Sequence, residues 1–226
     1  MVKIKLGHRT YKMSKRMTIE QWKALQPLDF DNPVSWAKIM SIGFKQPVSK
    51  FINVHEDSNL LGAGLILNEV NKRRETQLVD FTQFSIGEFI DLDIYIVQGW
   101  EKNLDVIIEH LCPKPLKYID EALWAIEQYS KFRTSIYRQY RVLFGIDEQG
   151  VQEREEEEYN PNKVAKGWYS VLVDLADDDL LKLDPITEQP LKKALNFMAL
   201  RKERIMAENA KQLQQKRQHD LQRNRR

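Results

Sequence analysis

The chain has 226 residues, enough for one large domain or two small ones, and its 42% of hydrophobic residues excludes a disordered protein. Lysine plus arginine number 35 and aspartate plus glutamate 33, so the net charge of +2 does not indicate a strongly electrostatic nucleic-acid binder. Cys112 is the single cysteine, which excludes an intrachain disulfide framework and a multi-cysteine metal site. No apolar stretch has the length of a membrane span, and the N-terminus lacks the apolar segment of a signal peptide, so we expect a cytoplasmic protein without membrane contact.

The first residues predict a β-hairpin. Val2–Leu6 alternates apolar and basic residues, Arg9–Met13 is a second short run, and Gly7-His8 between them fits a two-residue turn. Because two strands alone are not stable in water, we expect this hairpin to pack on the helices that follow.

Helix after helix then follows along the chain. The expected starts are marked by two capping boxes and by an asparagine-proline pair; they are Thr18 with Gln21, Ser85 with Glu88, and Asn32-Pro33.

Another helix should begin at Asp57 or Ser58 and contains two glycines, Gly62 and Gly64. Glycine weakens a helix by about 1 kcal/mol relative to alanine. The two glycines would be explained by a close crossing with another helix.

The middle of the chain predicts a helix that stops at Gly99, a separate helix over 100–112 and a long helix over 118–144. In the first of these, Asp91 and Asp93 are expected on a solvated or salt-bridged face. Paired catalytic carboxylates also need a pocket and opposed pKa values, and no sequence feature argues for either.

An acidic block at 147–158 interrupts this pattern. Such blocks are usually solvated, and turn residues follow it, so we expect a linker or long loop. The expected organisation is a hairpin plus helical domain at 1–146, an acidic linker at 147–162 and a C-terminal helical region with a basic extension at 163–226.

The C-terminal region predicts a helix over 163–176, a loop over 177–185 and a final long helix from near Glu188 or Pro190. The loop leucines, Leu180, Leu181 and Leu183, are expected to pack. The fold class is therefore mostly α: a helical bundle with a short N-terminal β-hairpin and a long C-terminal helix.

No set of residues predicts catalysis, and we expect no catalytic residue, cofactor or metal site. The histidines lack the spacing of metal ligands; they are His8, His55, His110 and His219. The carboxylates at 177–184 are of the type that holds Mg²⁺, but no phosphate-binding loop accompanies them.

The basic residues at 211–226 have the charge that phosphate contacts need. However, no aromatic residue follows Phe197, so base stacking is not supported and a nucleic-acid partner is disfavoured. An acidic protein surface explains this tail at least as well.

Two stretches, 81–116 and 167–209, resemble the tail assembly chaperones, or baseplate-hub assembly chaperones, of tailed bacteriophages. The matching segments of the first stretch are Phe84-Ser85-Ile86-Gly87-Glu88-Phe89-Ile90-Asp91-Leu92, Lys102-Asn103-Leu104 and Leu111-Cys112-Pro113. Those of the second are Asp179-Leu180-Leu181-Lys182-Leu183-Asp184 and Pro190-Leu191. The long acidic stretch 130–159 departs from the family pattern.

The resemblance implies a non-enzymatic protein that binds a tail protein, such as the tape measure or a hub or tube protein, in the host cytoplasm before the tail polymerises. A helical partner can cover the apolar stripe of an unassembled client helix.

The apolar stripe of the final helix outlasts the expected globular core, so that helix is our candidate contact surface. Its candidate residues are Ile205, Met206, Lys211, Leu213 and Arg217. The alternative is that these residues pack on the globular part of the protein or form a short coiled coil. A homo-oligomer is also possible from the sequence. The alternative functions are a structural component of the virion neck, tail or baseplate and a nucleic-acid-binding protein that uses the basic tail.

Overall fold

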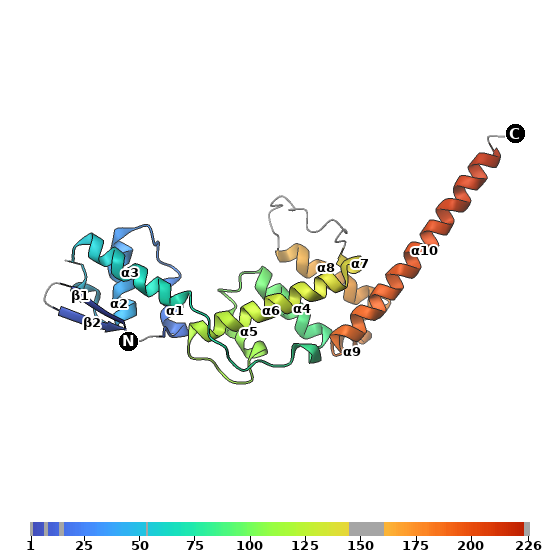
Figure 1. The fold of residues 1–226 in the computed structure, drawn as a ribbon. Coiled ribbons are helices and arrows are strands. Elements are labelled where there is room, and N and C mark those ends of the chain that lie inside the picture. The colour runs from blue at the N-terminus through green and yellow to red at the C-terminus, as the bar shows by residue number, and fades with distance from the viewer. Residues whose placement is uncertain (1, 7–8, 14–15, 53, 145–160, 224–226) are drawn as a thin grey trace. The chain divides into compact units, whose positions relative to one another are not determined.

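The computed structural model describes residues 2–6, 9–13, 16–52, 54–144 and 161–223, and helices dominate them (Figure 1). The predicted fold class is confirmed, with an N-terminal hairpin and a long C-terminal helix. The elements are β1 (Val2–Leu6), β2 (Arg9–Met13), α1 (Ile19–Leu25), α2 (Pro33–Phe44), α3 (Glu56–Val70), α4 (Ile86–Val97), α5 (Leu104–Leu111), α6 (Ile119–Gln139), α7 (Arg141–Phe144), α8 (Pro161–Ala176), α9 (Leu183–Thr187) and α10 (Leu191–Arg223).

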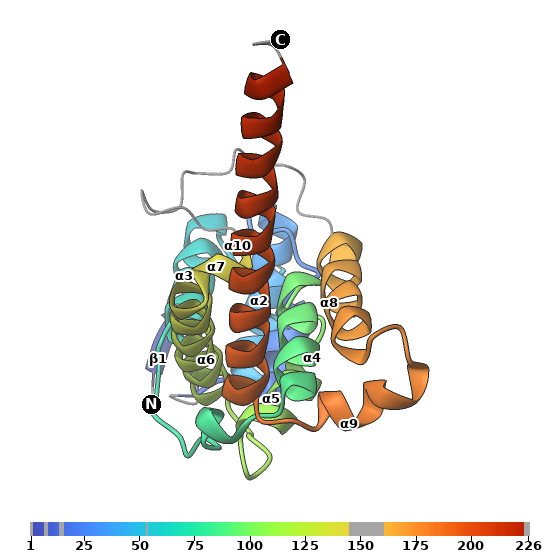
Figure 2. The same ribbon diagram turned by 90° about the vertical axis from the view of Figure 1, so that its right-hand side faces the viewer.

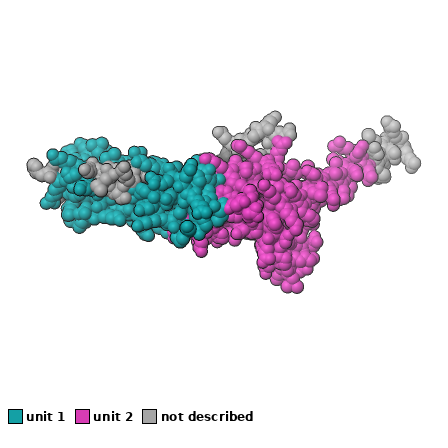
Figure 3. All heavy atoms as spheres, turned by 60° about the horizontal axis from the view of Figure 1, so that its bottom comes forward, with its two compact units in different colours: residues 1–79, 111–128 teal, residues 80–110, 129–226 magenta. Residues whose placement is uncertain are grey.

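The chain forms two compact units (Figure 3). Unit 1 contains residues 1–79 and 111–128, and unit 2 contains residues 80–110 and 129–226. Helix α6 contributes its N-terminal part to unit 1 and the remainder to unit 2. These bounds differ from the expected segments 1–146, 147–162 and 163–226. The expected acidic linker lies outside the described residues over 147–160.

In unit 1 the hairpin lies on the helices, as predicted. Strands β1 and β2 pair antiparallel with Leu6 opposite Arg9, the register of a two-residue turn. The ring of Tyr11 on β2 lies 6.0 Å from that of Phe44 and 5.1 Å from that of Phe51, between ring centroids. Both phenylalanines are buried, so the hairpin is held by an aromatic cluster. The expected turn residues 7–8 lie outside the described residues.

Helices α2 and α3 approach each other closely because two glycines lie at their contact. A Cβ atom added to Gly43 would meet Cδ1 of Ile66 at 2.4 Å, and one added to Gly62 would meet Sδ of Met40 at 2.2 Å. The predicted close crossing is therefore confirmed for Gly62. Gly64 differs, because no atom lies within 4 Å of a Cβ added there.

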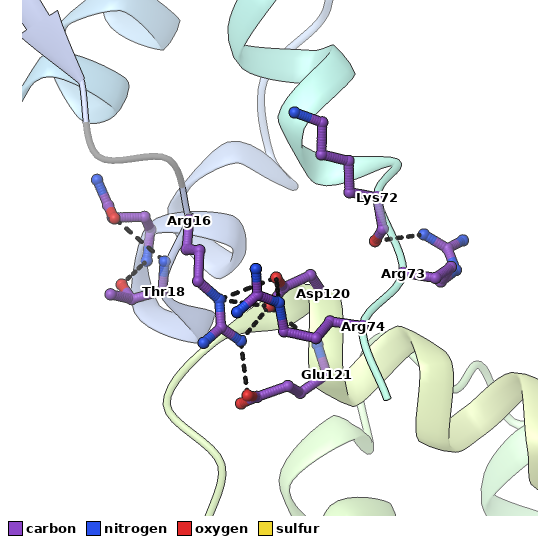
Figure 4. Close-up of polar contacts among 8 residues, drawn as sticks. Arg16, Thr18, Lys72, Arg73, Arg74, Asp120 and Glu121 are labelled. Atoms are coloured by element: carbon purple, nitrogen blue, oxygen red, sulfur yellow. Dashed lines mark hydrogen bonds and ion pairs between the residues drawn. The ribbon is translucent and has the colours of Figure 1, made fainter. Parts of the chain in front are cut away.

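In unit 1, an ion-pair cluster connects two arginines from the N-terminal part of the chain with the start of α6 (Figure 4). Arg16 donates from Nε to one oxygen of Asp120 at 2.9 Å and from Nη2 to the other at 2.7 Å, while Nη2 also lies 2.7 Å from Glu121. Arg74 brings a second guanidinium to 3.8 Å from Asp120. The hydrogen bond to Asp120 raises the pKa of Arg16 above its ordinary value. These contacts hold the start of α6 against the N-terminal part of the chain, in agreement with the assignment of residues 111–128 to unit 1.

The predicted capping boxes of α1 and α4 are both present. Thr18 and Ser85 each accept a bond from the backbone N–H three residues later, and the side chains of Gln21 and Glu88 accept the return bond. Such caps satisfy backbone groups that a helix terminus leaves without partners.

Three predicted helix boundaries were wrong. Helix α3 begins at Glu56, before Asp57 and Ser58, with the His55 carbonyl accepting its first bonds. Helix α5 begins only at Leu104, because the chain turns after Gly99, whose φ is +104°. The long helix expected over 118–144 is interrupted at Tyr140, between α6 and α7.

The expected loop over 177–185 contains a 3-10 turn, Leu180–Lys182, and the start of α9. The prediction that its leucines pack was wrong for Leu180 and Leu181, which are largely exposed. The side chain of Asp179 instead caps this turn by accepting from the N–H of Leu181 at 3.1 Å. The cap holds the turn without help from the leucine side chains.

Candidate functional site

A buried carboxylate joins three helices of unit 2. Asp93 on α4 has no exposed surface, and it accepts hydrogen bonds of 2.8 Å from the hydroxyl of Tyr137 on α6 and from the indole N–H of Trp168 on α8. Arg133 on α6 adds a charged donor, its Nε. An ionised carboxylate is tolerated in an apolar interior only when it is paired in this way. The cluster therefore fixes α8 against α4 and α6.

Aromatic rings surround this cluster. Phe89, one turn before Asp93 on α4, lies 5.9 Å from the ring of Trp168, edge to face. The guanidinium of Arg133 lies 4.8 Å from the centre of the Tyr137 ring. Nearby, burial raises the pKa of Tyr129 above its ordinary value. Asp93 itself presents no atom to a ligand, so the cluster acts as a support for the neighbouring surface.

Only part of this arrangement was predicted from the sequence. Asp93 is salt-bridged, one of the two predicted states, but its complete burial was not predicted. Asp91 lies two residues earlier on α4 and is exposed. The available signal was position: Asp93 comes four residues after Phe89 and three after Ile90, which places all three on one helical face. Arg133 and Trp168 could not be inferred as its partners.

Beside the cluster, unit 2 has a groove of about 620 Å³ between α6, α7, α8 and α10. Tyr137 and Trp168, which bond to Asp93, also line the groove, so the buried carboxylate holds part of its wall. The remaining lining is mostly apolar and includes Phe144, Val164, Val171, Leu175, Met198 and Ile205.

Two basic side chains bind α10 to the elements around this groove. Arg201 donates to the backbone carbonyl of Asp174 at the end of α8, and its guanidinium lies 3.5 Å from Asp177. Lys202 donates from Nζ to the carbonyl of Leu143 on α7 at 3.1 Å. Their charges, and that of Asp174, lie in a lining that is mostly apolar.

Helix α10 has a packed part and an exposed part. Its start is joined to the segment just before α4 by the N–H of Leu191, which donates to the carbonyl of Phe84 at 2.8 Å, and Leu195 and Met198 are buried. From residue 203 to residue 217 every side chain is exposed. Both ribbon views show this part of α10 running beyond the other helices of unit 2 (Figures 1 and 2).

The five candidate contact residues all lie on this exposed part. Met206 and Leu213 are 56% and 52% exposed, and Ile205, at 48%, also lines the groove. Lys211 and Arg217 are exposed on either side of Leu213. Because Met206 and Leu213 are seven residues apart, they lie on one face of α10. The structure thus brings the candidates onto one helix continuous with the groove, and their role in binding stays a prediction.

The described residues hold no group of three histidine, cysteine, aspartate or glutamate side chains placed to bind a metal ion. Cys112 is buried, and this burial raises the pKa of its thiol to about 11. Across the same part of the chain, no helix has the length and apolar character needed to cross a membrane.

Comparison with known proteins found no matching family model, no matching curated protein and no matching solved structure.

Proposed function

We propose that this chain is a non-enzymatic tail assembly chaperone of a tailed bacteriophage. It binds an aggregation-prone tail protein, such as the tape measure or a hub or tube protein, in the host cytoplasm before the tail polymerises. The observation that carries the proposal is the exposed part of α10, where apolar side chains stay uncovered on a helix anchored to unit 2. The resemblance of 81–116 and 167–209 supplies the class of client.

The surface is suited to an amphipathic client helix. Ile205 belongs both to the groove and to the exposed part of α10, so the exposed part begins at the edge of the groove. Fully burying a leucine, isoleucine or methionine side chain contributes about 1.5–3 kcal/mol, so covering the exposed halves of Ile205, Met206 and Leu213 contributes on the order of 3 kcal/mol. Filling the groove adds to this value, and helix-in-groove binding of this kind needs no catalytic group.

The positive charge of α10 indicates the charge that its partner should have. Lys211 and Arg217 flank Leu213, and the basic residues over 201–217 outnumber the acidic ones. A client helix with acidic residues beside its apolar stripe is therefore favoured over a basic one, since like charges across an interface are penalised. We expect binding to weaken as salt is raised.

Co-expression with the tape measure protein of the same phage tests the proposal. The wild-type chain should keep the client soluble and co-purify with it, whereas Met206→Glu/Leu213→Glu should not. The matched control is Gln215→Glu/Gln222→Glu, two positions that are also seven residues apart, which adds the same charge to α10 on the side opposite Met206 and Leu213. Equal client solubility with both double variants would contradict the proposed surface.

A further inference from the structure

A second exposed apolar surface lies in unit 1, on the side of α3 opposite α2. Helix α3 buries Ala63 and Ile66, while Leu60, Leu61 and Leu65 are 47%, 72% and 45% exposed. These three leucines lie within two turns of one helix, and about half or more of each side chain is exposed. They form an apolar face that the described part of unit 1 leaves uncovered. Faces of this kind are typical of protein contacts.

Gly64 lies in the middle of these leucines. Glycine destabilises the interior of a helix relative to alanine, so it needs a structural reason. Gly43 and Gly62 have one, since a Cβ at either would clash with the facing helix, but a Cβ at Gly64 would meet no atom within 4 Å. A glycine without an internal use, on an exposed apolar face, is suited to the close approach of another backbone.

The charges at the two ends of α3 indicate the direction in which a second helix would pack against it. Asp57 is exposed in its first turn, and three exposed basic residues, Lys72, Arg73 and Arg74, directly follow its end. Arg73 and Arg74 lie 3.8 Å from Glu127 and Asp120 of the same chain, but 39% and 61% of their side chains stay exposed to a second copy. A second α3 that runs antiparallel places the acidic start of each helix against the basic end of the other. A parallel arrangement would place like charges together. A two-fold axis near Gly64 also satisfies the requirement that such an interface be self-complementary.

We propose that two copies of this chain associate through α3, antiparallel, with the helices crossing at Gly64. This surface belongs to unit 1 and is separate from the groove and α10 in unit 2, so the proposal does not rest on the chaperone function. The dimer would present two client-binding surfaces.

The first test is sedimentation equilibrium of the full chain and of Gly64→Leu. The proposal expects a wild-type dimer and a dissociation constant raised at least about tenfold in the variant, because the leucine blocks the close crossing. Non-specific apolar association predicts the opposite, because the variant exposes more apolar surface. At a protein concentration below the wild-type dissociation constant, where both chains are monomers, the thermal midpoint of the variant should not fall, since leucine favours a helix and a side chain at residue 64 starts in open space.

Gly167→Leu is the matched control, because a Cβ at Gly167 on α8 also meets no atom within 4 Å. It should leave the dimer unchanged. A wild-type chain that sediments as a monomer at its highest soluble concentration, or a Gly64→Leu variant that associates as the wild type does, would overturn the proposal.

The second test measures orientation with Asp57→Cys and Lys72→Cys chains under mild oxidation. Mixing the two variants should give a cross-linked dimer, and neither variant alone should cross-link to itself. The native Cys112 is buried and does not compete. Self-linked dimers of either variant, without the mixed product, would show a parallel pair and overturn the antiparallel arrangement.

Discussion

Replacing Asp93 with asparagine should release α8 from unit 2. Asparagine keeps the shape of the side chain but removes the buried negative charge that the Arg133 guanidinium faces. It also weakens the bonds from Tyr137 and Trp168, since a neutral oxygen is a poorer acceptor than a carboxylate. Breaking a buried ion pair by removing one partner costs about 3–5 kcal/mol. The Arg133 side chain is 24% exposed and can reach water, so we expect a loss of about 3 kcal/mol, the lower end of this range.

Hydrogen exchange read by mass spectrometry gives the result for each unit separately. Some amides of α8 exchange only when unit 2 unfolds. If the free energy of unfolding falls by about 3 kcal/mol, these amides should exchange roughly 100-fold faster. Peptides from residues 16–52 of unit 1 should exchange as in the wild type. Urea unfolding should show the same loss in free energy for the transition of unit 2.

Asp91→Asn is the control, because Asp91 lies on the same helix and is exposed. Its effect on the free energy of unfolding should stay within about 0.5 kcal/mol. If Asp93→Asn changes α8 exchange no more than Asp91→Asn does, the buried carboxylate does not hold α8 and the reasoning is refuted.

Three further perturbations test the rest of the structure. Gly62→Ala should lower the free energy of unfolding by about 1–3 kcal/mol, because the new methyl meets Met40. Gly64→Ala should raise it by about 0.5–1 kcal/mol when urea titration is carried out at a protein concentration where the chain is monomeric. Removing the carboxylate of Asp120 with Asp120→Asn should destabilise unit 1 by about 2–3 kcal/mol through the loss of its bonds from Arg16, whereas an unchanged unfolding midpoint would contradict the role given to this cluster. The native thiol of Cys112 has a pKa raised from 9.0 to about 11, so it holds its proton more tightly than in the unfolded chain. Stability should be insensitive to this group below pH 9 and should fall from pH 9 to 11; Cys112→Ala should remove the part of the fall between pH 9 and 10, because the buried Tyr129 contributes only above its ordinary pKa of 10.0.

The features that the sequence predicted are those set by neighbours a few residues apart. The capping boxes at Thr18 and Ser85 depend on partners three residues later, and the hairpin register depends on a two-residue turn. The long C-terminal helix follows from a periodic stripe without a breaker. These signals are local, so they can be read without the tertiary structure.

The features that the sequence did not predict depend on distant partners. Arg16 and Asp120 are separated by 104 positions, and their contact places residues 111–128 in unit 1. Trp168 bonds to Asp93 across 75 positions and decides that this carboxylate is buried. The candidate residues on α10 were found because an apolar stripe that outlasts its core is visible in sequence, while the groove beside them needs four helices to form.

The most direct test of the chaperone proposal is quantitative mass spectrometry of purified phage particles beside the infected-cell lysate, with a peptide standard from this chain. A chaperone that leaves its client during assembly should be abundant in the lysate and absent from the particles. A fixed copy number in every particle would contradict the chaperone proposal and identify the chain as a structural component of the virion.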